Sequence, residues 1–289
     1  MKTAIFLGYT GLSGQVQRIV EGWIENGNAI FDLNKSALEY PDIIYANDSG
    51  FFDQAISLKE KYKKSILILN VLDLPKKYYP NLNLEEIKNK LNSADIITTI
   101  SEFSKKQIKD YLNLDAKVIY NPIKNINKYK IDRDIDFLYI GRLYEQNKRF
   151  GLGVNALSIL NVTKNQFFIA GPDDPGQGLN YLGEIDDHTL NMLYNRCKFL
   201  ICPTEYGVLG LPPIEAAICG CVPILCNDNE AAKEFQLVDF SFNPNPKDLA
   251  DGIASINNNH LEKLKSIGER LFNTLNKNKI AKNIEDLIC

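Results

Sequence analysis

The chain has 289 residues, of which 45% are apolar and 24% are charged, and its formal net charge at neutral pH is -3. This composition is typical of a globular protein, and the length allows two domains that each bury a core, which excludes a single small module. The small net charge excludes a strong overall attraction to nucleic acid or to an anionic membrane.

The charge is divided unevenly along the chain. Residues 1–131 carry a net charge of +3, and the remainder carries -6. The lysines of the basic half fit either an acidic binding partner or an ordinary solvated face. They are Lys59, Lys61, Lys63, Lys64, Lys76, Lys77, Lys105, Lys106 and Lys109.

The chain opens with an apolar run, Thr3 to Leu7, which predicts a strand. A glycine-rich turn follows, and a helix is expected from about Gln15 to Asn26. The glycines read G-x-x-G-x-x-G and not G-x-G-x-x-G, although Asp32 stands near the end of a second expected strand. This is a Rossmann-like opening without the dinucleotide fingerprint.

Strands then alternate with helical patterns, which predicts a parallel, doubly wound sheet of the α/β class. The strands are expected at 29–33, 42–46, 65–71, 96–100 and 117–120, with a helix starting near Ser104. The first domain is predicted to span residues 1–123, and the polar segment 124–134 is predicted to be a linker.

A second Rossmann-like domain is predicted over residues 135–270. Its first strand, Phe137 to Ile140, delivers Gly141 and Arg142 at its carboxyl end, and Lys148 follows six positions after the arginine. Arg149 is interpreted as a cation in solution and not as a ligand. Another strand is expected at 166–170, and the chain is expected to be helical after residue 244.

The stretch from Phe199 to Leu225 predicts strand, loop, helix and strand. Pro212 and Pro213 open the helix, whose free N–H groups point at whatever lies beyond the strand. Two carboxylates, Glu205 and Glu215, bracket the glycine-containing loop. An anion or a polyhydroxyl ligand suits this arrangement.

All six cysteines lie beyond residue 196 and are interpreted as core residues of a protein in the reducing cytosol. The triplet Asp186-Asp187-His188 is expected to cap a helix, and no metal is predicted. The apolar run Ala4 to Leu7 is too short for a signal peptide, and no run of about 18 apolar residues exists. We therefore expect a soluble, cytoplasmic protein, or one peripheral to a membrane.

The stretch TEYGVLGLPPIEAAICGCVPI resembles the donor-site signature of retaining GT-B glycosyltransferases of family 4, the glycosyl transferases group 1. The segments SADIITTISEFSKKQIKDYLNLDAKVIYNPI and DFLYIGRLYEQNKRFGLGVNAL are similar to other parts of that family. The resemblance implies a GT-B fold, with two Rossmann-like domains whose parallel sheets face a central cleft. It also implies that the helix at 271–289 returns toward the N-terminal domain.

By this resemblance the protein is an enzyme that moves a sugar from a nucleotide-diphosphate sugar, most simply a UDP-sugar, to an acceptor hydroxyl. The anomeric configuration is retained, and no metal ion or cofactor is required. Arg142 and Lys148 would stabilise the diphosphate leaving group, and Glu215 would bind the ribose hydroxyls. The other implied donor contacts are Gly11 and Gly14 for the phosphates, Gly141 beside the arginine, Gly183 and Ile185 for the base, and Val208, Leu209, Gly210 and Leu211 for the sugar.

Two departures from the family pattern leave alternatives open. Glu205 and Glu215 stand two residues further apart than the family's two glutamates, so either Glu205 or Gly207 occupies the first acidic position. Near the reacting carbon the family commonly has His-Asp, whereas this chain has Leu72 before Asp73. Glu205 and Asp73 are the resulting candidates for residues that contact the reacting sugar.

The acceptor is expected to be an anionic or lipid-linked glycan at a membrane surface, because residues 1–131 form the basic half of the chain. DNA that carries a hydroxymethylated base is the second acceptor class, used by some phage enzymes of this fold. A rival interpretation is a catalytically inactive subunit that only binds a sugar nucleotide.

Overall fold

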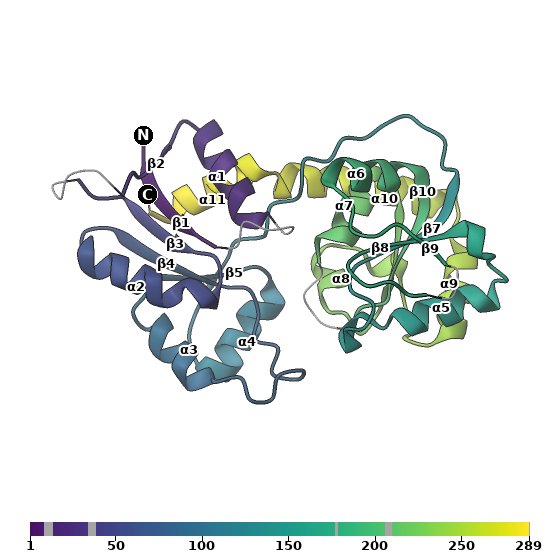
Figure 1. Ribbon diagram of the computed structural model, residues 1–289, viewed down its shortest axis with the longest axis horizontal. Coiled ribbons are helices and arrows are strands. Elements are labelled where there is room, and N and C mark those ends of the chain that lie inside the picture. Colours follow the sequence, from purple (N-terminus) through teal and green to yellow (C-terminus); the bar gives the residue numbers. More distant parts are fainter. Residues whose placement is uncertain (9–13, 34–38, 177–178, 206–209, 289) are drawn as a thin grey trace. The chain divides into compact units, whose positions relative to one another are not determined.

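The computed structural model describes residues 1–8, 14–33, 39–176, 179–205 and 210–288. The chain forms two compact units (Figure 1). The first unit comprises Met1–Pro122 and Thr274–Cys289, and the second comprises Ile123–Asn273.

The first unit is built on a parallel sheet with strand order β2-β1-β3-β4-β5-β6. Its central strands β3 and β4 are buried on both faces and are apolar apart from Asn70, as is usual in parallel sheets covered by helices. The edge strands, expected at 29–33 and 117–120, are two residues long. The strands are β1 (Thr3–Leu7), β2 (Ala29–Ile30), β3 (Ile43–Ala46), β4 (Ile66–Val71), β5 (Ile96–Thr99) and β6 (Lys117–Val118).

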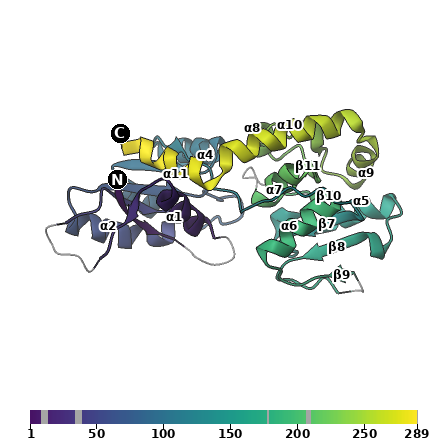
Figure 2. The same cartoon turned by 90° about the horizontal axis from the view of Figure 1, so that it is seen from above.

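Helices cover both faces of the first sheet because right-handed crossovers place helices on opposite sides once the strand order reverses. The helices α2, α3 and α4 lie on one face, and α1 lies on the other beside α11 (Figures 1 and 2). The bounds are α1 (Gln15–Glu25), η1 (Ser49–Phe51), α2 (Phe52–Lys61), α3 (Leu84–Leu91), α4 (Glu102–Leu112), α11 (Lys277–Glu285) and η5 (Asp286–Ile288).

The contact between α1 and α11 is close enough to require a glycine. A Cβ atom on Gly22 would lie 2.3 Å from the carbonyl oxygen of Lys277. The ammonium of Lys277 is 3.1 Å from a carboxylate oxygen of Glu21 and 2.7 Å from one of Glu25. The last helix is therefore fastened to the first helix of the same unit.

The second unit is built on a parallel sheet with strand order β12-β11-β10-β7-β8-β9. Its strands β7 and β10 are neighbours, with Phe137 opposite Phe199 and the two rings stacked 5.4 Å apart. The strands are β7 (Ile135–Ile140), β8 (Phe167–Ala170), β9 (Asn180–Tyr181), β10 (Cys197–Cys202), β11 (Val222–Cys226) and β12 (Ser241–Phe242).

In the second unit α6 contacts α7, and α5 contacts α9. The helices α7 and α10 cross closely, because a Cβ atom on Gly268 would lie 2.6 Å from the carbonyl oxygen of Ala217. The bounds are η2 (Gln146–Lys148), α5 (Phe150–Ile159), η3 (Lys164–Gln166), α6 (Asp187–Arg196), α7 (Leu211–Cys219), α8 (Ala231–Glu234), η4 (Val238–Phe240), α9 (Pro246–Ser255) and α10 (Asn258–Leu275).

Residues 124–134, predicted as a linker, lie within the second unit. The backbone N–H of Tyr129 donates to Asn195 Oδ1 at 2.7 Å, and Arg133 Nη1 donates to the carbonyl oxygen of Tyr194 at 3.0 Å. Irregular backbone that packs on a domain needs such partners for its polar groups. The segment is thus ordered by side chains of α6 and by backbone carbonyls near its end.

No helix within the described ranges is long and apolar enough to cross a membrane.

Candidate active site

The sequence motifs of the second unit meet at a topological switch point. The strand order reverses between β7 and β10, so the loops that follow these two strands diverge to opposite faces of the sheet. Ligands bind at such points, beyond the carboxyl ends of the strands. Gly141 and Arg142 follow β7 directly, and Glu205 lies three residues after β10.

The loop after β7 carries the two predicted phosphate-binding cations. Gly141 has a φ of 137°, which favours glycine, and its N–H donates to the carbonyl oxygen of Ala170 at 3.0 Å. Arg142 is exposed, and its Nη1 lies 2.8 Å from Glu145 Oε1. Lys148 is the last residue of η2 and is half-buried. Both cations therefore belong to one short loop at the switch point.

The loop after β8 is hydrogen-bonded to the loop after β7. The N–H of Gly171 donates to the carbonyl oxygen of Gly183 at 3.0 Å, and Asp173 accepts from the N–H of Leu143 at 2.8 Å. A Cβ atom on Gly171 would lie 2.3 Å from the carbonyl oxygen of Gly141. Gly183 has a φ of 72°, and Ile185, half-buried, follows two residues later.

Glu205 is bound to the loop after β7 through both its backbone and its side chain. Its N–H donates to the carbonyl oxygen of Asn147 at 2.9 Å. Its Oε2 is 2.9 Å from Arg149 Nη2, and the same nitrogen is 2.7 Å from Asp228 Oδ2. The interpretation of Arg149 as a cation in solution is therefore wrong, since the guanidinium is only 20% exposed and lies between two carboxylates.

Glu215 is the middle residue of α7 and is 1% exposed. Its Oε1 accepts from the backbone N–H of Lys124 at 3.1 Å, and its Oε2 accepts from the hydroxyl of Tyr194 at 3.4 Å. Burial raises the pKa of Tyr194 well above its usual value, and the charge of Glu215 raises it further, so the phenol stays protonated and can donate.

Gly210 is the N-cap of α7, and Leu211 is its first residue. The helix begins with the two prolines within its first turn, where a missing N–H costs nothing. Gly207, Val208 and Leu209, predicted to contact the sugar, lie outside the described residues.

The predicted sites of the first unit stand at the carboxyl edge of its own sheet. Gly14 is the N-cap of α1, with a left-handed φ of 47°, and it closes the loop that follows β1. The strand order reverses between β1 and β3, so this loop also lies at a switch point. Asp73 is half-buried two residues after β4, and Gly11 lies outside the described residues.

No group of three or more His, Cys, Asp or Glu side chains within the described parts of the chain is arranged to hold a metal ion. Asp186 is the N-cap of α6, and its side chain accepts from the N–H of Thr189 at 2.7 Å, as expected for a capping residue. Burial raises the pKa of the Cys219 and Cys226 thiols to about 12, which keeps both uncharged.

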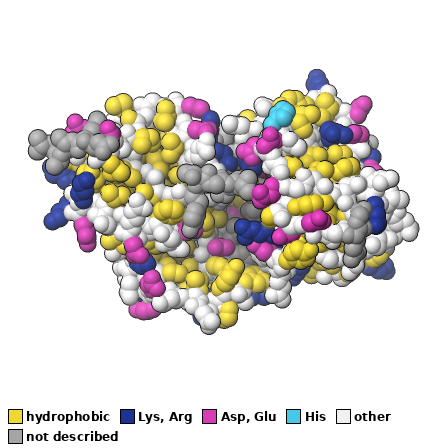
Figure 3. Space-filling model, in the orientation of Figure 1, with side chains coloured by type: hydrophobic (Ala, Val, Ile, Leu, Met, Phe, Trp, Pro, Cys, Tyr) yellow, Lys and Arg dark blue, Asp and Glu magenta, His cyan; other side chains and the backbone are white. Residues whose placement is uncertain are grey.

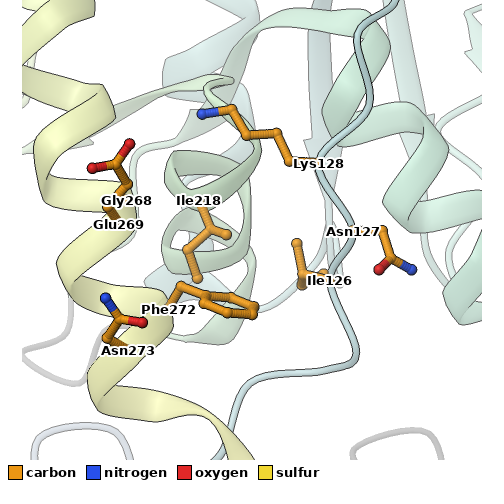
Figure 4. A pocket seen from close by; sticks show the side chains of 8 residues that line it. All are labelled: Ile126, Asn127, Lys128, Ile218, Gly268, Glu269, Phe272 and Asn273. Atoms are coloured by element: carbon orange, nitrogen blue, oxygen red, sulfur yellow. The ribbon is translucent and has the colours of Figure 1, made fainter.

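A cavity of about 350 Å³ lies elsewhere in the second unit, beside the C-terminal end of α7 (Figure 4). Ile218 and Phe272 form part of its wall, and Lys128 and Glu269 lie at its edge. Its described lining residues come from 126–128, α7 and α10, and not from the loops that follow β7 and β10.

Sequence reasoning missed the roles of Asp228 and Tyr194. Asp228 lies in the loop after β11, next to Asn229, whose Nδ2 donates to the carbonyl oxygen of Thr204 at 3.2 Å. The signal that could have found Asp228 is its place just beyond the carboxyl end of a predicted strand adjacent to β10. Tyr194 carries no such signal, because it is one apolar-patterned residue of a helix.

A family model described as glycosyl transferases group 1 matches residues 123–273. The O-antigen chain mannosyltransferase B of Escherichia coli is 24% identical over 227 residues, which are 66% of this chain. The chain spans 58% of the length of that curated relative.

Solved structures with the same fold cover the whole chain. Anabaena Alr3699/HepE, solved in complex with UDP and glucose, superposes with a TM-score of 0.76 at 14% identity and covers 100% of this chain and 99% of its own. Sucrose-phosphate synthase from Thermosynechococcus elongatus gives a TM-score of 0.73 at 14% identity, with coverage of 99% and 98%. The prediction of two Rossmann-like domains of the GT-B type is confirmed.

Proposed function

Because the chain belongs to the glycosyl transferases group 1 family, we propose that it moves a sugar from a nucleotide-diphosphate sugar to an acceptor hydroxyl, with retention of the anomeric configuration. The observation that carries this proposal is the joining of the loops after β7 and β10. Glu205 donates its backbone N–H to Asn147 at 2.9 Å, within the loop that carries Arg142 and Lys148. Two cations and a carboxylate are thus gathered at one switch point.

The cations suit the leaving group. When the bond between the sugar and the diphosphate breaks, negative charge develops on the diphosphate oxygens, and fixed cations stabilise that charge. Arg142, whose side chain is 69% exposed, can turn toward a bound diphosphate, and Lys148 lies six residues further along the same loop. Transfer of this kind needs no pair of glycosidase carboxylates.

Other residues of the second unit are suited to bind the nucleoside. A carboxylate can accept from both ribose hydroxyls, and Glu215 lies at the middle of α7, whose N-terminal N–H groups favour an anionic or polyhydroxyl ligand. Gly183 and Ile185 are proposed contacts of the base. We propose a UDP-sugar as donor, since Anabaena Alr3699/HepE was solved with UDP-glucose.

Neither a metal ion nor a cofactor enters this mechanism. Arg142 and Lys148 would supply the charge that a divalent ion supplies elsewhere. The leaving phosphate would help to remove the proton of the acceptor hydroxyl, and Asp73 or Glu205 would hold the reacting sugar. Transfer is therefore expected to continue in the presence of EDTA.

We propose an anionic or lipid-linked glycan as acceptor. The segment after β4 presents Lys76, whose ammonium lies 5.7 Å from the centroid of the Tyr111 ring, and Tyr79, which is 64% exposed. Cations beside exposed aromatic rings suit sugars and anionic groups. On the face in Figure 3, however, the described Lys and Arg side chains are interspersed with acidic ones over both units. DNA with a hydroxymethylated base needs a continuous basic surface and is the second choice of acceptor.

The proposal is tested by measuring thermal shifts with a series of UDP- and GDP-sugars and then the release of nucleoside diphosphate from each binder. A stabilising nucleotide sugar that is also turned over supports the enzyme, whereas binding without release identifies an inactive binding subunit. A chain that binds none of them contradicts both.

Alanine variants test whether Arg142 and Lys148 bind the diphosphate. Lys148→Ala and Arg142→Ala should each lower turnover by about one to two powers of ten. Each variant loses about 1.5 to 3 kcal/mol of charged hydrogen bonding, and about 1.4 kcal/mol changes a rate tenfold. Lys198→Ala is the matched control, since Lys198 pairs with Asp136 near the amino end of β10. Near-normal rates in both site variants would reject the phosphate assignment.

A further inference from the structure

One guanidinium of the second unit is held between two carboxylates that come from different loops. Arg149 Nη2 is 2.9 Å from Glu205 Oε2 and 2.7 Å from Asp228 Oδ2. The three side chains are between 20% and 34% exposed, so water screens their charges only partly. Burial disfavours the charged form of Arg149, but the hydrogen bond and charge of Asp228 outweigh it and raise the pKa of the guanidinium.

Backbone and amide contacts hold the same three loops together. The N–H of Glu205 donates to the carbonyl oxygen of Asn147 in the loop after β7. Asn229, 1% exposed in the loop after β11, donates to the carbonyl oxygen of Thr204 at 3.2 Å. The strands β11, β10 and β7 are consecutive in the sheet, so the loops at their carboxyl ends form a continuous rim. Arg149 is the cation at the centre of this rim.

The backbone of Arg149 also has an unusual conformation. Its φ of 48° and ψ of 40° are left-handed, and it is the N-cap of α5. Glycine adopts this conformation freely, whereas a side chain makes it about 1–2 kcal/mol less favourable. An arginine at this position therefore lowers the stability of the backbone, and its ion pairs with Glu205 and Asp228 offset this cost.

We propose that Arg149 is a positioning residue for Glu205: it fixes the carboxylate in place for the hydroxyls of the donor sugar, while Asp228 holds the guanidinium from the other side. This inference rests on the proposed function. Arg149 differs from Arg142 in its surroundings: its side chain is 20% exposed and its Nη2 lies between two carboxylates, whereas the side chain of Arg142 is 69% exposed and pairs with Glu145. Through Nη2, Arg149 acts on the sugar by way of Glu205; its Nη1 is buried and has no hydrogen-bond partner among the described residues, so the affinity for UDP below tests whether this nitrogen also contacts the diphosphate.

Either Glu205 or Gly207 takes the first acidic position of the donor signature, and the contacts of Arg149 bear on this choice. Glu205 is a site residue if its carboxylate is built into the rim, and a surface residue if Gly207 takes that position. The ion pair with Arg149 and the backbone bond to Asn147 favour Glu205. Without the guanidinium of Arg149 between them, the carboxylates of Glu205 and Asp228 would repel each other as like charges.

The experiment compares four proteins: the wild type, Arg149→Ala, Glu205→Ala and the double variant. For each, the affinity for UDP alone, the affinity for the UDP-sugar selected by the binding screen, and the kcat and KM of transfer are measured. Each single variant should lower kcat at least about tenfold, which corresponds to about 1.4 kcal/mol. The double variant should be no slower than the slower single one, because both changes remove the same interaction.

The affinity for UDP separates positioning from direct binding. It should stay within about twofold of the wild type in Arg149→Ala, whereas Lys148→Ala should weaken it. Arg149→Lys should restore part of kcat, because an ammonium keeps the charge but lacks the planar fork that bridges two carboxylates. Arg196→Ala, which removes a surface ion pair with Asp134, is the control expected to leave kcat unchanged.

The outcomes that overturn the inference are distinct. Additive losses in the double variant, an equal loss of affinity for UDP and UDP-sugar, or wild-type kinetics in Arg149→Ala would each reject it while leaving the proposed function in place. A wild-type protein that binds no nucleotide sugar would reject both. If Arg149→Ala fails to fold, Asp228→Asn replaces it: it should lower kcat, with no further loss when combined with Glu205→Ala, and unaltered kcat would reject the inference.

Discussion

At the scale of single residues, burial decides which groups can act. Glu215 is 1% exposed and accepts from both Lys124 and Tyr194, so the protein has already satisfied part of its hydrogen-bonding capacity. A carboxylate has about four acceptor positions, and a ribose would use some of them in the proposed complex. These protein donors fix the orientation of the carboxylate before a ligand arrives, which lowers the entropy lost on binding.

This orientation can be tested at Tyr194. Tyr194→Phe removes a donor at 3.4 Å from Glu215 Oε2 and should raise the KM for the donor about two- to tenfold with little change in kcat, because a hydrogen bond contributes about 0.5–1.5 kcal/mol. Steady-state kinetics at varied donor concentration measure it. Tyr45→Phe is the matched control: Tyr45 is equally buried in the first unit, and its hydroxyl donates to Asn47 at 3.4 Å. Equal KM values in both variants would contradict the role of Tyr194.

At the scale of elements, the loops carry the chemistry and the helices hold the units together. The last helix, α11, belongs to the first unit although it follows the second unit in sequence. Its approach to α1 depends on Gly22, and Lys277 adds ion pairs with Glu21 and Glu25. The hydrogen bond from Lys277 raises the pKa of its own ammonium and lowers the pKa of the Glu25 carboxyl, but Glu25 is exposed, so this pair adds little stability.

Close packing at Gly22 therefore contributes more than charge to this contact. Gly22→Ala should destabilise the first unit by about 1–3 kcal/mol, because the new methyl group would meet the Lys277 carbonyl oxygen and neither backbone can withdraw easily. Urea unfolding measures the change. Gly151→Ala, in α5, is the matched control: nothing lies within 4 Å of the added atom, and a helical alanine should leave stability equal or higher. Equal stability of the two variants would show that the helices can separate without cost.

At the scale of the whole molecule, charge bears on the acceptor. The first unit carries a net charge of +1 and the second unit carries -4, because Lys124, Lys128 and Lys130 belong to the second unit. An anionic acceptor should therefore be drawn to exposed lysines of the first unit more than to the second unit.

This asymmetry predicts a salt dependence. If the acceptor is polyanionic, transfer at subsaturating acceptor should fall as salt rises from about 50 to 200 mM, because screening weakens the attraction of exposed lysines. Initial rates at fixed donor concentration measure it, with hydrolysis of the donor in the absence of acceptor as the control for salt effects on the donor site. A flat profile would point to a neutral sugar or another small acceptor.

The sequence by itself determined the two parallel sheets, since alternating apolar runs and helical patterns are local and reflect burial on both faces. It also determined the helix start at α7, because prolines and small residues act on their own backbone. The strands at 29–33 and 117–120 were expected to be longer than they are, because the end of an edge strand is set by its neighbour and not by its own residues. Their positions at strand ends, together with the resemblance to a known family, singled out Arg142, Lys148, Glu205 and Glu215.

Only the tertiary structure decided how these residues are held. The contact of Arg149 with Glu205 and Asp228 joins three loops, and the contact of Glu215 with Lys124 joins residues 91 positions apart. No local spacing encodes such distances, because they follow from the order in which the strands lie side by side. Because β11, β10 and β7 lie side by side, the loops at their carboxyl ends are neighbours, and strand order results from long-range packing of the whole sheet.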